Sequence, residues 1–149
     1  MAASHSGLNE EFIRSLPDGS PVVMLNLVRF NARSRDGNGS GRDAYLRYSR
    51  LVIALIKARG GDVIWAGDAE GMAFGELAGG PWDYVVLVHY PSRAAFLDMM
   101  TSPEYAAANE HRENGLADHV IIATRQTYSK LAAGRCTAGS HHIRTSLST

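Results

Sequence analysis

The sequence predicts an α+β fold in which two long helices cover one face of a four-stranded antiparallel sheet. Four segments have the apolar, β-branched character of strands, and two longer segments have the apolar spacing of helices. These segments alternate in the order β-α-β-β-α-β. At 149 residues, the chain has an ordinary length for one domain with a hydrophobic core.

The four strands are expected where apolar runs lie between turn residues. Residues 21–30, PVVMLNLVRF, are almost continuously apolar, which indicates a central buried strand. Residues 62–67, DVIWAG, form the second strand. In one alternative, this strand continues into MAFGEL as the arm of an extended or bulged hairpin. Residues 82–90, WDYVVLVHY, and 119–128, HVIIATRQTY, complete the sheet.

The two helical regions are recognised by apolar spacing and by their boundary residues. Residues 42–59 carry apolar side chains at helical intervals and end at a Gly-Gly pair. The second region begins after Ser92, which is a good N-cap, and ends at Gly115. The letters TSP interrupt it, and Ser102 followed by proline is the signal of a new helix start. We therefore expect a break and a restart within this region.

The chain divides into three parts in this interpretation. Residues 1–20 form an N-terminal helix capped by Asn9, and residues 21–128 form the α/β domain. Residues 129–149 have weak periodicity and many small polar side chains. We expect them to be a flexible tail, an extension that clasps a partner, or a remnant of expression.

The order of elements is that of ferredoxin-like folds. Right-handed crossovers place both long helices on one face of the sheet. The first and third strands, however, are apolar at both odd and even positions, so a bare second face would expose a large apolar patch. A second copy packed about a twofold axis covers it most simply. We predict a homodimer through the sheet face, a dimeric α/β barrel.

Charge and composition exclude several classes of function. Fifteen Lys and Arg balance fifteen Asp and Glu at a pI near 7.0, which argues against nucleic acid and membrane partners. The single Cys136 and the lack of a signal-like segment lead us to expect a cytoplasmic protein. The six histidines show no metal-ligand spacing, so no metal site is expected, and only His111 is well placed as an axial haem ligand.

The glycine-rich segment NARSRDGNGSG, residues 31–41, lies between a strand and a helix. Its spacing is G-x-G-x-G, whereas dinucleotide-binding turns have G-x-G-x-x-G. A mobile lid or a plain linker is therefore the favoured interpretation over phosphate binding.

Candidate site residues lie on the strands and on the restarted helix. Asn26 interrupts an apolar strand, and its buried amide either bonds a neighbouring side chain or contacts a ligand. His89 ends a central strand and is a candidate acid or base, although a structural histidine is the more common case. Trp65 suits a pocket wall, a dimer interface or the core. Tyr105 and Arg112 share one helix face, either a solvated edge or a pocket rim.

The segment VVLVHYPSRAAFLDMMTSPEYAAANEHRENG, with Tyr48, the Gly-Gly step and WAG, resembles the uncharacterised bacterial family called domain of unknown function 1330. The resemblance covers roughly residues 21–128 and implies the dimeric α/β-barrel superfamily. His89 departs from it, since the family usually has an acidic residue there, and DGNGSG is an insertion. The positions that match the family pattern are Tyr48, Pro91, Ser92, Ser102, Pro103, Glu104, Tyr105 and Arg112.

The resemblance implies a ligand between sheet and helices but no established reaction. We expect a site in which Arg112 binds a carboxylate or other anion and His89 transfers protons. The chemistry would need no cofactor and would be monooxygenase-like or proton transfer, on a small aromatic or carboxylate-bearing compound. The ligand-binding residues expected with them are Asn26, Tyr48, Trp65 and Tyr105. The alternative is a non-catalytic dimeric binding or scaffold protein with no cavity of ligand size.

Overall fold

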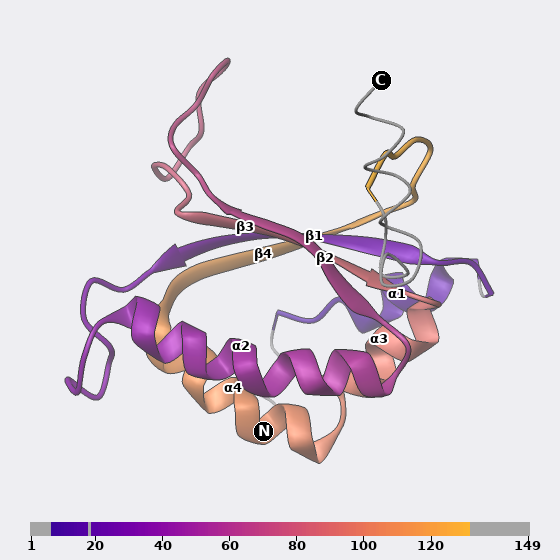
Figure 1. The fold of residues 1–149 in the computed structure, drawn as a ribbon, viewed down its shortest axis with the longest axis horizontal. Helices are drawn as coiled ribbons and strands as arrows, with labels where there is room; N and C mark the ends of the chain where they lie inside the picture. Colours follow the sequence, from indigo (N-terminus) through magenta and orange to yellow (C-terminus); the bar gives the residue numbers. More distant parts are fainter. Residues whose placement is uncertain (1–6, 18, 132–149) are drawn as a thin grey trace, which may run out of the picture.

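The fold is described by a computed structural model over residues 7–17 and 19–131 (Figure 1). The elements are α1 (Glu10–Ser15), β1 (Val22–Phe30), α2 (Gly41–Ala58), β2 (Asp62–Asp68), β3 (Tyr84–Tyr90), α3 (Arg93–Met100), α4 (Pro103–Gly115) and β4 (Leu116–Thr124). The predicted element order is confirmed, and the second helical region is divided at the predicted break. Most of the predicted tail, residues 132–149, lies outside the described residues.

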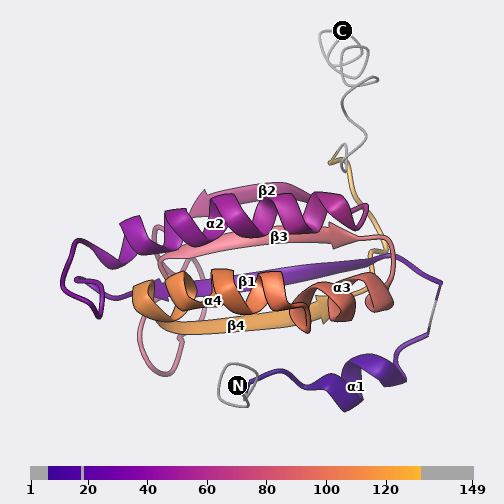
Figure 2. The ribbon, with the colours of Figure 1, turned by 90° about the horizontal axis from the view of Figure 1, so that it is seen from below.

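The four strands form one antiparallel sheet in the order β2-β3-β1-β4, which is the ferredoxin-like arrangement. The four helices named above lie on one side of this sheet, and α2 and α4 run lengthwise along its strands (Figures 1 and 2). We call this side the helix face and the other the open face. Side chains alternate between the two faces along each strand. On β1 the even-numbered residues face the helices, and Met24 and Val28 are buried there at 1% and 0% exposure.

Local sequence signals explain where three of the four helices begin. Ser40, Ser92 and Ser102 occupy the N-cap positions of α2, α3 and α4, and each hydroxyl accepts a hydrogen bond from a backbone N–H in the first turn. The apolar residues of these helices then pack on the even-numbered side chains of β1 and β3 to form one core. Among the described residues, no helix is both long and apolar enough to cross a membrane.

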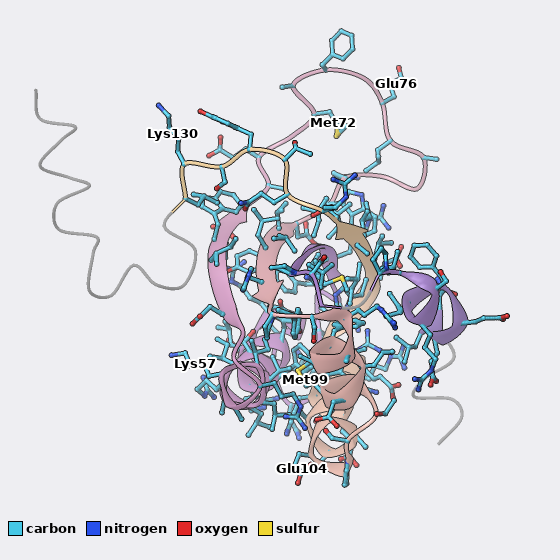
Figure 3. The ribbon with its side chains drawn as sticks, turned by 90° about the vertical axis from the view of Figure 1, so that its right-hand side faces the viewer. Lys57, Met72, Glu76, Met99, Glu104 and Lys130 are labelled. Atoms are coloured by element: carbon cyan, nitrogen blue, oxygen red, sulfur yellow. The ribbon has the colours of Figure 1, made fainter. Side chains whose placement is uncertain are left out.

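The segment between β2 and β3, residues 69–83, forms an arm that rises on the side of the sheet away from the helices (Figure 1). The arm contains no strand. The alternative in which the second strand continues into this segment as a hairpin is therefore wrong. The base of the arm is fixed by Arg29, whose guanidinium lies 3.9 Å from the ring centroid of Trp82 and donates to the carbonyls of Gly80 and Pro81. Figure 3 shows Met72 and Glu76 on this arm, far from Glu104 on the helix side.

The boundaries of the fourth strand and the role of the glycine-rich segment differ from the prediction. β4 begins at Leu116, directly after α4, and ends at Thr124 rather than at residue 128. The glycine-rich segment bonds to the end of α4, because the Asn114 amide donates to Asp36 and accepts from the Asp36 backbone N–H. Its residues line neither of the two cavities described below. Dinucleotide binding and a lid over the site are therefore both disfavoured.

Candidate functional site

Two cavities lie between the sheet and the helices. The smaller has a volume of about 170 Å³, and the larger has a volume of about 390 Å³. They are neighbours, because both are lined by Met24, Phe96, Met100 and Ile121. The larger cavity is mostly apolar and lies between α2 and the sheet. The smaller has polar groups at one end, which makes it the better candidate for a specific site.

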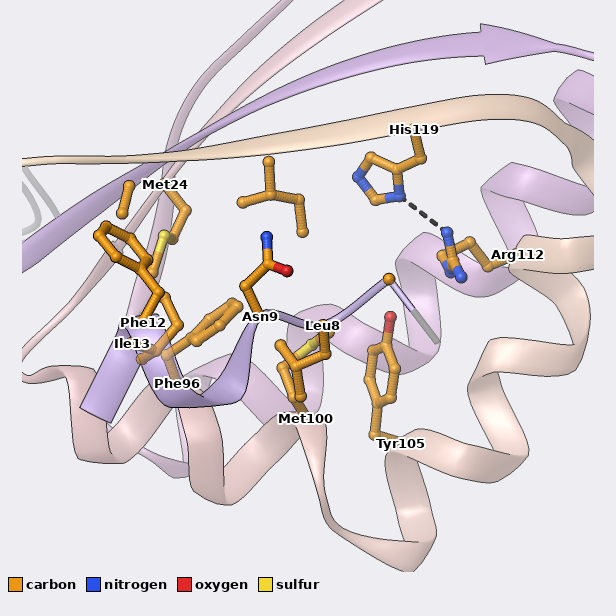
Figure 4. A pocket seen from close by; sticks show the side chains of 13 residues that line it. Leu8, Asn9, Phe12, Ile13, Met24, Phe96, Met100, Tyr105, Arg112 and His119 are labelled. Atoms are coloured by element: carbon orange, nitrogen blue, oxygen red, sulfur yellow. Dashed lines mark hydrogen bonds between the residues drawn. The ribbon is translucent and has the colours of Figure 1, made fainter. Parts of the chain in front are cut away.

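The polar end of the smaller cavity is formed by side chains from α4, from β4 and from the segment before α1 (Figure 4). Tyr105 and Arg112 come from α4, where a separation of seven residues places them on the same helix face. His119 comes from β4, and Asn9 precedes α1. The helical spacing thus directs the mixed face of α4 toward the sheet, as the rim of a cavity rather than as a solvated edge.

His119 is a neutral ring with both nitrogens bonded. Its Nδ1 lies 3.1 Å from Nη1 of Arg112, and its Nε2 lies 2.8 Å from Oδ1 of Asn26. Arg112 can only donate, so Nδ1 accepts and Nε2 carries the proton that is donated to Asn26. Burial, helped by the Arg112 charge, lowers the pKa of His119 to about 3. His119 is therefore uncharged at neutral pH.

Arg112 is held by uncharged groups, and among residues 7–17 and 19–131 it pairs with no carboxylate. Its Nε donates to Oδ1 of Asn109 at 2.5 Å, while the nearby Glu113 accepts from Asn109 instead. The ion pairs between described residues all involve other side chains. A partly buried guanidinium at a cavity wall, without a counter-ion among the described residues, is a good anion-binding group.

Two tyrosines extend this polar network into the core. The hydroxyl of Tyr48 lies 3.0 Å from that of Tyr105, and both side chains are buried. Burial raises the pKa of both hydroxyls, and for Tyr105 the adjacent Arg112 guanidinium opposes part of that rise. Both tyrosines are therefore neutral hydrogen-bonding groups. Tyr48 lines the larger cavity and Tyr105 the smaller, so the pair joins the two.

Four of the six predicted site residues come together in this network: Asn26, Tyr48, Tyr105 and Arg112. Asn26 bonds a neighbouring side chain, which was one of its two expected alternatives. Its amide also donates to the carbonyls of Met24 and Val86, at 3.2 and 3.4 Å.

The other two predicted residues, His89 and Trp65, lie on the open face. His89 stands between Val88 and Tyr90, whose side chains are buried under the helices, so its own side chain points the other way. Trp65 pairs with Leu87 across the sheet and is 46% exposed. The expectation that they line a pocket between sheet and helices is corrected here. A one-residue difference in strand position reverses the face.

His119 and Asn9 are the residues that sequence reasoning missed as parts of the site. His119 is followed by three apolar residues, Val120, Ile121 and Ile122. The sequence pattern therefore does not show whether the odd-numbered or the even-numbered side chains of this strand face the helices. Pairing with β1, in which His119 lies opposite Val28, decides it. Within residues 7–17 and 19–131, no group of three or more His, Cys, Asp or Glu side chains could hold a metal ion.

Fold and site define a small ferredoxin-like α+β protein with a polar network between its sheet and helices. The model of the family "Domain of unknown function (DUF1330)" matches residues 40–125, which is more than half of the chain. The chain belongs to this family.

Solved structures agree with this assignment. The chain is similar to RPA0582, a protein of unknown function from Rhodopseudomonas palustris, with 34% identity, a TM-score of 0.71, and coverage of 81% of this chain and 95% of that one. Methylated RPA0582 gives the same identity and TM-score, with 82% and 93% coverage. A hydroxynitrile lyase from Passiflora edulis, at 16% identity, a TM-score of 0.53, and coverage of 74% and 97%, is similar in fold alone. The curated proteins contain no match.

Proposed function

We propose that this protein binds a small carboxylate-bearing molecule in the smaller cavity, with the carboxylate on Arg112. The observation that carries the proposal is the guanidinium itself, which lines the cavity and has no carboxylate partner among the described residues. A planar guanidinium matches the geometry of a carboxylate and can bind it through two parallel hydrogen bonds.

The size and lining of the cavity support a small ligand with an apolar part. Its volume of about 170 Å³ exceeds the roughly 15 Å³ needed by a water molecule and is below the roughly 300 Å³ at which drug-sized pockets begin. The apolar side chains that line it include Phe12, Ile13, Met24, Phe96 and Met100.

The state of the polar groups favours binding over proton transfer at neutral pH. With a pKa of about 3, His119 is a poor base near pH 7, and the buried tyrosines keep their protons. We propose a cofactor-independent site that orients its ligand through fixed, neutral hydrogen-bonding groups and one positive charge. The two cavities weigh against the alternative of a scaffold without any ligand-sized space.

Replacing Arg112 tests the proposal. We expect butyrate and benzoate to shift the amide signals of cavity residues in an NMR titration of the wild type. Arg112→Met should weaken their binding by about tenfold or more, because a charge-assisted hydrogen bond contributes roughly 1.5 to 3 kcal/mol. Arg33→Met, on the exposed glycine-rich segment, and His89→Ala, on the open face, are matched controls. Equal affinities in Arg112→Met and the wild type would refute the site.

We further propose that two copies pack through their open faces. This face carries exposed apolar side chains, among them Trp65 at 46%, Val120 at 37% and Ile122 at 44%. The arm on the same side has Phe74 at its tip, 94% exposed. Large apolar side chains exposed at both edges of one sheet face are uncommon on a monomer. A second copy of the same sheet matches it in shape and polarity.

A charge placed on the open face, at Ile122 of the edge strand β4, is expected to separate the copies. Ile122→Glu should raise the dimer dissociation constant by about a hundredfold or more, because a buried carboxylate without a partner costs several kcal/mol. Analytical ultracentrifugation across a dilution series measures it. Leu51→Glu, at a similarly exposed leucine on α2, is the control. A wild type that sediments as a monomer at all concentrations would exclude the proposal.

A further inference from the structure

The N-terminal segment closes one side of the smaller cavity. Gly7, Leu8, Asn9, Phe12 and Ile13 all line it, and Figure 4 shows Leu8 beside Met100 and Tyr105. This segment precedes the region matched by the family model, residues 40–125. The wall that it forms comes from the part of the chain that lies before β1.

Asn9 occupies the N-cap position of α1 without acting as a cap. Its backbone angles are φ −88° and ψ 70°, outside the extended region of a normal N-cap residue, and its side chain makes no capping hydrogen bond. The N-cap serines of α2, α3 and α4 all make that bond. The Asn9 side chain points instead across the cavity toward β4 (Figure 4). The capping role predicted for it is thus corrected.

The other polar groups around the cavity are already bonded to each other. Both ring nitrogens of His119 have partners, and the hydroxyls of Tyr105 and Tyr48 bond one another. Among the described residues, no side-chain hydrogen bond is formed by Asn9, whose amide is exposed at the edge of the cavity. Within the part of the chain that the structure describes, two cavity-lining groups keep spare hydrogen-bonding capacity. These are the amide of Asn9 and the N–H groups of Arg112 beyond those bonded to Asn109, His119 and Tyr105.

We infer that Asn9 is a ligand-binding residue and that the ligand is a short-chain carboxylate with a hydroxyl or carbonyl substituent. An amide offers both a donor and an acceptor, so it binds a neutral polar group rather than a second charge. A site that hydrogen-bonds a substituent discriminates against the analogue lacking it, because its own polar group then loses a partner. The inference rests on the proposed carboxylate site, and it adds the second point of recognition.

A series of matched acids tests this assignment. NMR titrations would compare butyrate with its 2-hydroxy, 3-hydroxy and 4-hydroxy derivatives, which move one hydroxyl along the same chain. We expect the wild type to bind at least one hydroxy acid about fivefold more tightly than butyrate, as a neutral hydrogen bond allows. In Asn9→Ala the affinities for that hydroxy acid and for butyrate should differ by no more than about twofold. Asn38→Ala, the same change on a segment outside the cavity, should keep it.

The outcomes separate the inference from the proposed function. If the acids bind through Arg112 but no hydroxy derivative is preferred, or the preference survives in Asn9→Ala, the role of Asn9 is refuted and the carboxylate site stands. If none of the acids binds, both are refuted. A loss of folding does not mimic the effect, because Asn9→Ala removes no capping bond and should keep the melting temperature of the wild type. Ser92→Ala, which removes one, should lower it.

Discussion

Gly41→Ala is expected to destabilise the protein by about 3 kcal/mol or more, which is near the upper end for a single added methyl group. Gly41 is the first residue of α2, and it packs against the last residue of α4, Gly115. A Cβ atom at Gly41 would lie 2.0 Å from the carbonyl oxygen of Asn31 and 2.5 Å from that of Gly115. Both obstacles are backbone atoms, so the backbone at Asn31 and the end of α4 would both have to move away from α2. Urea denaturation measures the loss.

Gly39→Ala, two residues earlier, is the matched control. A Cβ atom there has the Asp43 carboxylate as its nearest neighbour, at 3.7 Å, and the residue has no positive φ. We expect its free energy of unfolding to stay within about 0.5 kcal/mol of the wild type. Equal urea midpoints for Gly41→Ala and Gly39→Ala would show that the close approach of α2 and α4 is not a constraint.

Gly41 also shows why the glycine-rich segment was hard to interpret from sequence. Three alternating glycines suggest a phosphate loop or a linker, because glycine patterns are usually assigned to local turn geometry. Glycine is required at position 41 by tertiary packing, because it allows close contact with Gly115, which is 74 positions away in the chain. Only the packing of α2 on α4 creates that requirement.

The fold itself was predictable because its signals are local. Serine caps, a Ser-Pro restart, one Gly-Gly pair and Gly115 mark the helices, and apolar runs mark the strands. These signals agree with one another over most of the chain, which is the condition for a sequence to specify its fold well. The order of elements then leaves few topologies.

The site was only partly predictable because strands with two apolar faces hide their orientation. Tyr105 and Arg112 were found through helical spacing, which is unambiguous once a helix is assigned. His89 and His119 both lie on strands in which adjacent residues are apolar, so parity carried no information. His89 was predicted to lie in the pocket, but its side chain lies on the open face. His119 was not predicted to be a site residue, but it lies at the centre of the hydrogen-bond network.

The network places one positive charge among neutral partners. Hydrogen bonds or close approach link its members one after another, and none of them is an anion. In spatial order they are Asn26, His119, Arg112, Tyr105 and Tyr48. Burying an arginine in this way has a desolvation cost that a bound carboxylate would offset. This arrangement explains why His119 has to stay neutral, since a second positive charge would face Arg112 directly.

His119 is therefore expected to make the protein markedly less stable in acid. In the unfolded chain its pKa is near 6.5, whereas in the folded protein burial and Arg112 lower the pKa to about 3. Between these values the unfolded state binds a proton that the folded state does not, so acid favours unfolding. The loss begins below about pH 6.5, reaches roughly 3 kcal/mol by pH 4, and is complete below about pH 3.

The variant His119→Asn isolates this contribution, because an amide keeps an acceptor for Arg112 and does not titrate. Urea denaturation of both proteins between pH 7 and 4 should show the wild type losing about 3 kcal/mol more than the variant, since carboxylate titrations cancel in the comparison. The ring signals of His119 in the folded protein should also stay at their neutral positions down to pH 5. A ring that titrates near pH 6.5, or equal slopes for the two proteins, would mean that His119 accepts a proton beside Arg112. The charge arrangement proposed for carboxylate binding would then be wrong.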